Sequence, residues 1–420
     1  MKIGLQTWGS NGDIRPMLAL AGGLQRAGHS LTLAVSSIDN SDYSEICRHL
    51  NIRYIKAPEH MDFDMPAFAR RTYRMNTLQW LNALLEEAFF PYEQTIYRTA
   101  RALSEKNDCL LGHHFLYPLK LAAKKQHKPF ISITLCHAAI DTVSRPPFRF
   151  PDFGASINRL EWRLLHLLFD FALKKRLSKL WLQENMPPVG HVYPGLLTSE
   201  QLNLVAVDPL FCPLSDEWSP VHRVCGFLNL PDSAEIWQPP EQLQDFLQQG
   251  EAPVYMTFGS LQQAVPEWSM ELFITAAETA GCRAIIQTSS RVYPAGSQRG
   301  KLYFIGRHPH QPLFKHCAAV VHHGGAGTSH AAVRSGCASI VVPFMDEQLF
   351  WGWQLHDLGL ACKPLPARKA TGKYLAKRIV LVLKSGAMQD NARSAGQRMQ
   401  QHDAVTHAVG LIQQFCGNAS

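Results

Sequence analysis

Short apolar runs alternate with amphipathic stretches along most of the chain. Residues 2–7 form an apolar run of strand length, and a glycine-containing loop follows it. From residue 14 to 28 apolar side chains recur with helical spacing until Gly28, a residue typical of helix ends. Residues 31–35 are a second apolar run of strand length. This β-α-β order predicts a parallel, doubly wound sheet.

The same pattern continues through both halves of the chain. Strand-like runs separated by helical stretches lie at residues 53–56, 109–112, 130–135, 254–258, 284–288, 302–305, 319–322 and 339–343. A polar, proline-rich segment at 226–253 divides them and is typical of an interdomain connection. We therefore expect two α/β, Rossmann-like domains, residues 1–228 and 229–395, facing each other across a cleft. Residues 396–420 predict a helical tail that packs back on the first domain.

Composition and charge narrow the class of protein. The chain has 420 residues, of which 46% are hydrophobic and 18% charged, so it can form compact cores and is not disordered. Its net charge of +7 is spread without a dense basic stripe, which argues against a nucleic-acid partner. The ten cysteines form no CxxC pair, so we expect free thiols in a reducing compartment and no zinc site. The sequence also lacks a signal peptide pattern and an apolar stretch of membrane-spanning length, and we expect a cytoplasmic protein.

The segment 320–348, VVHHGGAGTSHAAVRSGCASIVVPFMDEQ, carries the strongest chemical pattern. A predicted strand ends at His322 and His323, and Gly324, Gly325 and Gly327 then allow the backbone to turn tightly against a ligand. A helix is predicted to begin at Thr328, where free N–H groups and the helix dipole favour an anion. A second glycine turn, 258–260, opens the same half. These features predict a diphosphate site, although a βα turn that binds nothing has the same pattern.

The next predicted turn supplies polar side chains. Asp346, Glu347 and Gln348 follow the strand at 339–343, and a carboxylate beside an amide is suited to sugar hydroxyls. The alternative is an acidic loop that only contacts solvent.

At these residues the sequence resembles the UDP-glycosyltransferases of family GT1, especially the branch of bacterial macrolide, glycopeptide, rhamnolipid and sterol glucosyltransferases. The resemblance rests on HHGGAGTSHAAVRSGCASIVVPFMDEQLFWGWQLHDLGL, on the linker GFLNLPDSAEIWQPPEQLQDFLQQGEAPVYMTFGSL and on the opening WGSNGDIRPMLALAGGLQRAGHSLTLA. Residues 39–199 are less familiar. The resemblance implies a GT-B fold, which consists of two facing Rossmann-like domains.

The resemblance also implies roles for individual residues. The diphosphate would contact Ser260, His323, Gly325, Gly327 and Thr328. Glu347 and Gln348 would hold the donor sugar, although the family often has aspartate before this glutamine. The nucleobase would lie at Arg307 and His308, where the family often has an aromatic residue instead. No metal and no cofactor are expected, because the helix N-terminus and the histidine would stabilise the leaving group.

Sugar transfer also needs a base for the acceptor hydroxyl. Asp13 in the first glycine loop is our candidate, and the comparable residue is aspartate in the bacterial branch. The alternative is that Asp13 only caps the following helix. His113, His114 and His137 follow other predicted strands, and we expect them to line the acceptor pocket.

These observations predict an inverting transferase that moves a hexose, with glucose expected, from a UDP-sugar to a hydroxyl of a hydrophobic small molecule or lipid. A nucleotide-sugar epimerase of the same architecture and a non-catalytic auxiliary protein are the alternatives. The basic, aromatic segment 158–184 predicts a long helix. It can cover the core, form a wall of the acceptor pocket or contact an anionic membrane peripherally. We expect a monomer or a weak dimer.

Overall fold

The computed structural model describes residues 1–72, 75, 77–193, 195–230, 238–263 and 265–418. Contacts divide the chain into two compact units. Unit 1 comprises Met1–Phe63, Leu78–Leu230 and Asp403–Ser420, and unit 2 comprises Asp64–Thr77 and Pro231–His402. The expected boundaries therefore differ from the structure in three places. Residues 64–77 group with unit 2, the second unit resumes at Pro231 instead of residue 229, and the tail begins at Asp403 instead of residue 396.

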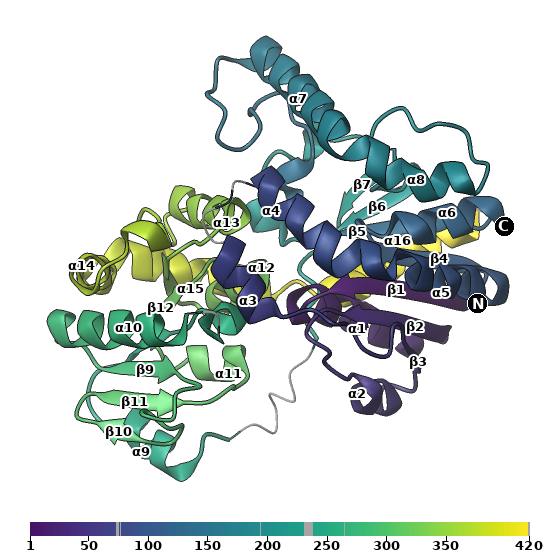
Figure 1. Ribbon diagram of the computed structural model, residues 1–420. Coiled ribbons are helices and arrows are strands. Elements are labelled where there is room, and N and C mark those ends of the chain that lie inside the picture. Colours follow the sequence, from purple (N-terminus) through teal and green to yellow (C-terminus); the bar gives the residue numbers. More distant parts are fainter. Residues whose placement is uncertain (73–74, 76, 194, 231–237, 264, 419–420) are drawn as a thin grey trace. The chain divides into compact units, whose positions relative to one another are not determined.

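The sheet of unit 1 has seven parallel strands in the order β3-β2-β1-β4-β5-β6-β7 (Figure 1). The strands are β1 (Lys2–Gly9), β2 (Ser30–Ser37), β3 (Arg53–Lys56), β4 (Cys109–His113), β5 (Phe130–Thr134), β6 (Leu202–Val205) and β7 (His222–Val224). The apolar runs of the first half predicted the first five of them. β6 and β7 were not predicted, since they are short and follow a long segment of loops and helices.

Helices and turns complete unit 1. The α-helices are α1 (Asn11–Arg26), α2 (Ser44–His49), α4 (Thr77–Leu84), α5 (Glu93–Lys106), α6 (Tyr117–Lys125), α7 (Ala155–Phe169), α8 (Lys175–Gln183) and α16 (Ala404–Asn418). π-helical turns occur at Leu85–Phe89 and Asp170–Lys174, and 3-10 turns at Phe90–Tyr92, His137–Ala139, Pro209–Phe211 and Ser215–Glu217. The predicted single helix at 158–184 is therefore two helices joined by a π-helical turn.

The C-terminal helix α16 packs against α1 within the core of unit 1. Val405, Ala408 and Ile412 belong to the same buried cluster as the apolar residues of α1 and β1. Gly23 of α1 makes this close approach possible, because a Cβ at that position would lie 2.3 Å from Cγ1 of Val405. The preceding helix α15 (Gly386–Gln400) remains in unit 2, which explains why the tail begins later than expected.

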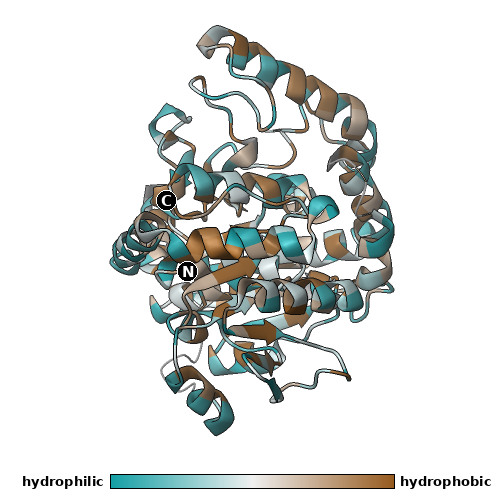
Figure 2. Ribbon diagram, turned by 90° about the vertical axis from the view of Figure 1, so that its left-hand side faces the viewer, coloured by the Kyte–Doolittle hydropathy of each residue, from teal (hydrophilic) through white to brown (hydrophobic). Residues whose placement is uncertain are grey.

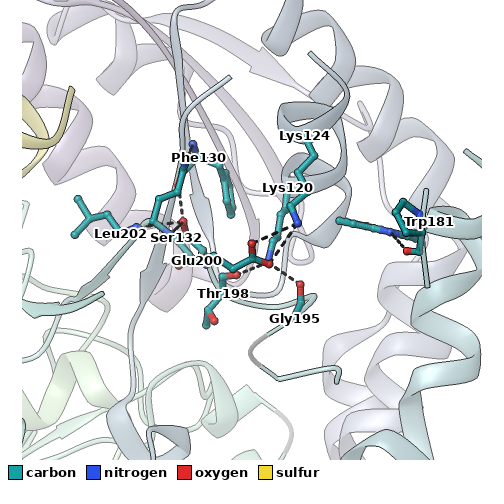
Figure 3. Close-up of polar contacts among 12 residues, drawn as sticks. Lys120, Lys124, Phe130, Ser132, Trp181, Gly195, Thr198, Glu200 and Leu202 are labelled. Atoms are coloured by element: carbon teal, nitrogen blue, oxygen red, sulfur yellow. Dashed lines mark hydrogen bonds and ion pairs between the residues drawn. The ribbon is translucent and has the colours of Figure 1, made fainter. Parts of the chain in front are cut away.

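A buried lysine fastens the loop before β6 to α6 (Figure 3). Lys120 is 2% exposed, and its Nζ donates to the carbonyl oxygens of Gly195 and Thr198, each at 2.6 Å. Glu200 lies 3.4 Å from the same Nζ. Burial lowers the pKa of Lys120 to about 8. This lysine supports the loop, since its donors are engaged by protein oxygens.

The sheet of unit 2 has six strands in the order β10-β11-β9-β8-β12-β13. The strands are β8 (Val254–Met256), β9 (Ala284–Gln287), β10 (Gln298–Arg299), β11 (Leu302–Ile305), β12 (Ala319–His322) and β13 (Ala338–Val341). Only the pairing of β10 with β11 is antiparallel. The predicted strands of the second half are thus all present.

The helices of unit 2 pack around this sheet (Figure 1). They are α3 (Met65–Thr72), α9 (Glu241–Gln248), α10 (Pro266–Ala280), α11 (His310–Phe314), α12 (Ala326–Arg334), α13 (Asp346–Asp357), α14 (Gly372–Lys384) and α15, with 3-10 turns at Gly259–Gln263 and Ala367–Lys369. One core cluster joins α9, α11 and α12 to the central strands. Elsewhere α10 packs on α14, which contacts β12 and β13. This arrangement leaves the loops after the parallel strands at one edge of the sheet.

Candidate functional site

Each sheet has a point at which the direction of winding reverses. In unit 1 the chain runs outward from β1 through β2 to β3, and then returns to β4 on the other side of β1. In unit 2 it runs from β8 through β9 to β11 and returns to β12 beside β8. Ligands of open α/β sheets bind beyond the carboxyl ends of strands at such switch points. Ligands are therefore expected at the loops after β1, β4, β8 and β12.

At the switch point of unit 2, His323 lies between two glycines. A Cβ at Gly259 would lie 3.3 Å from Cε1 of His323, and a Cβ at Gly325 would lie 2.4 Å from its Nε2. Gly259 also has φ of 59°, a conformation that side chains rarely adopt. The two glycine turns that the sequence singled out thus meet around one imidazole ring.

The imidazole of His323 is neutral and has an unused polar atom. Burial, together with the neighbouring His310, lowers the pKa of His323 to about 4. Its Nδ1 is buried and has no hydrogen-bond partner among the described residues. A buried polar atom without a partner is costly, so this nitrogen is suited to a ligand.

The helix after His323 presents an open N-terminus. α12 begins at Ala326, so Gly327 and Thr328 lie in its first turn, whereas the sequence predicted a helix from residue 328. Gly325 is the N-cap residue, no side chain caps the helix, and its first turn contains no acidic residue. Free N–H groups without a competing carboxylate favour an anion such as phosphate.

The first turn of α13, which follows β13, touches the glycine turn. Gly324 has φ of 92°, and a Cβ there would lie 2.6 Å from the carbonyl oxygen of Gln348. Gln348 is buried, and its Oε1 accepts a hydrogen bond of 2.9 Å from the N–H of Phe344. The amide nitrogen of this side chain and the second lone pair of Oε1 are therefore left for a ligand. Glu347 is exposed in the first turn of α13.

The candidate nucleobase residues lie on another part of the edge. Arg307 and His308 follow β11, which is separated from β8 by β9. Arg307 is exposed, and Nδ1 of His308 lies 3.2 Å from the carbonyl oxygen of Gly306. The side chain of Ser260 lies outside the described residues, so the structure places only its turn after β8.

At the switch point of unit 1, Asp13 meets His113. Asp13 lies in the first turn of α1 after β1, and His113 is the last residue of β4. Oδ1 of Asp13 lies 3.8 Å from Nε2 of His113. Oδ2 accepts hydrogen bonds from the backbone N–H of Ser10 at 2.8 Å and from its hydroxyl at 3.1 Å. Asp13 therefore does complete a capping box, but only one of its oxygens is used for it.

The electrostatic environment of Asp13 suits a base. Its side chain is 36% exposed and otherwise covered by protein. This partial burial raises the pKa of Asp13 from 3.8 to about 6, although the hydrogen bonds from Ser10 lower it. Burial also lowers the pKa of His113 to about 4, so this ring is neutral. Nδ1 of His113 accepts from the N–H of Phe115 at 3.4 Å, which assigns the proton to Nε2, on the side of Asp13.

The other two candidate histidines of unit 1, His114 and His137, follow β4 and β5 at the same edge of the sheet. The ring of His114 is centred 4.4 Å from that of His113, and His137 follows β5 with its ring 6.1 Å from that of Trp218. Burial lowers the pKa of both histidines, that of His137 to about 4. The pairing of Asp13 with His113 was not predicted. The signal for it is that β1 and β4 are the two strands on either side of the switch point.

The described residues contain neither a metal-binding cluster nor a membrane-spanning helix. Within the described parts of the chain, no group of three or more His, Cys, Asp or Glu side chains is arranged to hold a metal ion. Among the described helices, none is both long and apolar enough to cross a membrane.

Comparison with known proteins gives related sequences along the whole chain. The model for "Erythromycin biosynthesis protein CIII-like, C-terminal domain" matches residues 296–410. The O-mycaminosyltylonolide 6-deoxyallosyltransferase of Streptomyces fradiae is 26% identical, and the alignment covers 99% of this chain and 97% of that protein. The sterol 3-beta-glucosyltransferase of Saccharomyces cerevisiae is 25% identical over 98% of this chain. The chain spans only 35% of the length of that yeast relative.

The fold is also found among solved structures. The glycosyltransferase VinC in complex with dTDP superimposes with a TM-score of 0.67 at 17% identity, covering 100% of both chains. This likeness concerns the fold, and together with the two parallel sheets it confirms the predicted GT-B class.

Proposed function

We propose, from the premise that the chain belongs to the GT1 family of glycosyltransferases, that it transfers a hexose from a UDP-sugar. The acceptor is a hydroxyl group of a hydrophobic small molecule or lipid. The transfer inverts the configuration at the anomeric carbon. Membership in the family makes the protein a transferase. The observation that carries the proposal is the Asp13 carboxylate, which has a raised pKa and one oxygen left for a substrate.

The proton chemistry is assigned to unit 1. Oδ1 of Asp13 accepts the proton of the acceptor hydroxyl, and the oxygen that results attacks the anomeric carbon of the donor sugar. A pKa of about 6 leaves the carboxylate largely ionised at pH 7 while keeping it more basic than an ordinary aspartate. The Nε2–H of neutral His113 lies 3.8 Å from Oδ1, beyond hydrogen-bond distance, and its dipole favours the ionised carboxylate.

Leaving-group stabilisation is assigned to unit 2. As the bond between the anomeric carbon and the diphosphate breaks, negative charge collects on the phosphate oxygens. The N–H groups of the first turn of α12 and the imidazole of His323 lie where they can donate to such an oxygen. Attack from the face opposite the departing diphosphate inverts the anomeric configuration. We propose that these protein donors act without a metal ion or a cofactor.

The donor and the acceptor follow from the relatives. The yeast relative is named a glucosyltransferase that acts on sterols, and this supports glucose as the sugar and an apolar acceptor. VinC was solved with dTDP, so the nucleobase is the part of the donor that most needs a test. We propose contacts of Glu347 and Gln348 with the sugar and of Arg307 and His308 with the base. The turn at Ser260 would reach the phosphates.

We also propose that the protein is cytoplasmic and that it is a monomer or a weak dimer. All ten cysteines lie among the described residues and none forms a disulfide, which is consistent with a reducing compartment.

Radiolabel transfer tests the function. The full chain is incubated with UDP-[14C]glucose or TDP-[14C]glucose, with and without EDTA, and with a panel of sterols, macrolide aglycones and polyphenols. We expect acceptor-dependent label transfer from the UDP-sugar that EDTA leaves unchanged, and products with inverted configuration by NMR. Label in a free epimerised UDP-sugar would instead indicate an epimerase, and binding of UDP without turnover of any acceptor would indicate an auxiliary protein.

A further inference from the structure

A stripe of large apolar side chains that runs from just before α7 to the π-helical turn after it is exposed. In Figure 1, α7 extends beyond the sheet of its own unit, and Figure 2 shows brown segments recurring along this helix. The exposed side chains are Phe153 (65%), Ile157 (43%), Leu160 (62%), Leu164 (48%), Leu167 (57%), Leu168 (42%) and Phe171 (93%). They follow one another mostly at intervals of three or four residues, so they lie on one helical face. Single exposed apolar residues are ordinary, but a continuous stripe marks an interaction surface.

The opposite face of α7 is fixed to unit 1. Trp162 is buried, and its Nε1 donates to the carbonyl oxygen of Arg145 at 3.0 Å. Nδ2 of Asn158 donates to the carbonyl oxygen of Val143 at 3.3 Å and to Asp152 at 3.1 Å. These contacts hold the helix in one rotation, with its apolar stripe turned away from its own unit.

Cations accompany the stripe. Arg159, Arg163, Lys175 and Lys179 are exposed and form no ion pair with any described residue. The acidic residues between Phe153 and Phe171 are little exposed. Asp170 is 12% exposed and contacts His191 and the N–H of Val192, and Glu161 is half-buried. The outward side of α7 and α8 therefore combines apolar side chains with unpaired positive charge.

This combination is typical of a helix that lies in the plane of a membrane surface. Apolar side chains enter the acyl boundary, while arginine and lysine contact anionic lipid phosphates. A protein partner would need an apolar groove fringed by acids, whereas an anionic bilayer offers both features over any length of helix. No described helix is suited to cross the bilayer, so the contact is peripheral.

We propose that the stripe from Phe153 to Phe171, which we call the α7 face, docks on membranes that contain anionic lipid. Leu160, Leu164 and Phe171 insert at the acyl boundary, and Arg159 and Arg163 contact lipid phosphates. The docking does not depend on the identity of the donor or acceptor. Its consequence for the transferase is access to acceptors dissolved in the bilayer.

Liposome flotation of the full chain tests the α7 face. Vesicles contain phosphatidylcholine alone or with about 30 mole percent phosphatidylglycerol, in low salt and in about 0.5 M salt, which screens surface charge. The wild type should float with the anionic vesicles at low salt. The triple variant Leu160→Ser, Leu164→Ser and Phe171→Ser should lose at least ~10-fold of this binding. The double variant Arg159→Gln and Arg163→Gln should lose the preference for anionic lipid.

A matched control removes exposed apolar residues elsewhere. Val292 is 78% and Leu381 is 47% exposed in unit 2, and Val292→Ser with Leu381→Ser should leave flotation unchanged. Circular dichroism and thermal unfolding check that every variant is folded.

The proposal is overturned if the wild type binds no vesicle or if the triple variant floats like the wild type. It is also overturned if sedimentation shows that the wild type is a dimer and the triple variant a monomer, since the stripe would then be a subunit interface. A loss of turnover of a water-soluble acceptor in parallel with flotation would likewise overturn it, since the stripe would then be a pocket wall. Transfer of label to a water-soluble acceptor measures the proposed function separately from membrane binding.

Discussion

The two units have the same kind of sheet but different chemistry at the point where the winding reverses. In unit 1 that point holds titratable side chains, with Asp13 after β1 and His113 at the end of β4. In unit 2 it holds glycines, the neutral side chains of His322 and His323, and the open N-terminus of α12. A carboxylate with a raised pKa handles a proton, whereas backbone N–H groups at a helix end hold an anion without exchanging one. In the proposed mechanism one architecture therefore serves both halves of the transfer reaction, and the loop residues decide which half.

Replacing the carboxylate is expected to have the largest effect. Asp13→Asn keeps an oxygen acceptor for the N–H of Ser10 and removes the base. We expect turnover to fall by about 10²–10⁴-fold, the usual contribution of general base catalysis. The affinity for UDP should stay unchanged, and thermal unfolding should not occur at a lower temperature, because burial disfavours the charge that is removed. Steady-state kinetics, calorimetry and a thermal scan give the three values, and a parallel loss of UDP affinity would contradict the division of labour between the units.

A methyl group in the glycine turn is the matching change in unit 2. Gly325→Ala places a Cβ 2.4 Å from Nε2 of His323 and displaces the ring. Loss of one buried hydrogen bond costs about 1–3 kcal/mol, so UDP affinity should fall roughly 5- to 150-fold. Gly386→Ala is the control, since nothing lies within 4 Å of its Cβ position. If the two variants bound UDP equally well by calorimetry, the role of the turn would be wrong.

The pH dependence of activity should separate the units further. In the proposed mechanism activity requires ionised Asp13, so kcat/KM should fall as pH decreases through about 6. Binding of the intact UDP-sugar, whose diphosphate does not titrate in this range, should remain constant because His323 stays neutral down to about pH 4. The effect on stability has the opposite sign: the raised pKa of Asp13 means that its ionisation, between pH 3.8 and about 6, makes the folded state less stable. His113→Phe removes the Nε2–H that faces the carboxylate and so disfavours its ionised form. The pH at which kcat/KM falls on the acid side, the acid limb, should therefore move to higher pH, and kcat should fall by about 3- to 10-fold.

His114→Phe is the matched variant for this experiment. It alters the neighbouring ring while the His113 ring next to Asp13 is kept, so the acid limb should stay near pH 6. An acid limb that also stays in place for His113→Phe would leave that histidine with a packing role only.

The sequence indicated the fold and the separate parts of the site, but not how the parts combine. The apolar runs predicted most strands, and the glycines around His323 predicted a turn and a helix. The contact of His113 with Asp13 joins residues 100 positions apart, and it depends on β4 returning to the side of β1, an order that no local pattern encodes. The same applies to Gly259 and His323. The π-helical turn within 158–184 was also not predictable from periodicity, since a single five-residue turn is too short to show a repeat of its own.

A lysine away from both switch points provides the smallest expected effect on activity. The pKa of Lys120 is lowered to about 8, a shift comparable to that of Asp13, yet its Nζ is engaged by Gly195, Thr198 and Glu200 (Figure 3). Lys120→Met leaves two carbonyl oxygens without their donor, so the free energy of unfolding should fall by about 1–3 kcal/mol. Below the unfolding transition, kcat/KM should change less than about twofold, since a perturbed pKa marks catalysis only where a substrate can reach the group. Urea unfolding and kinetics at one temperature measure both quantities, and a large loss of turnover in a fully folded variant would show that chemistry extends beyond the two switch points.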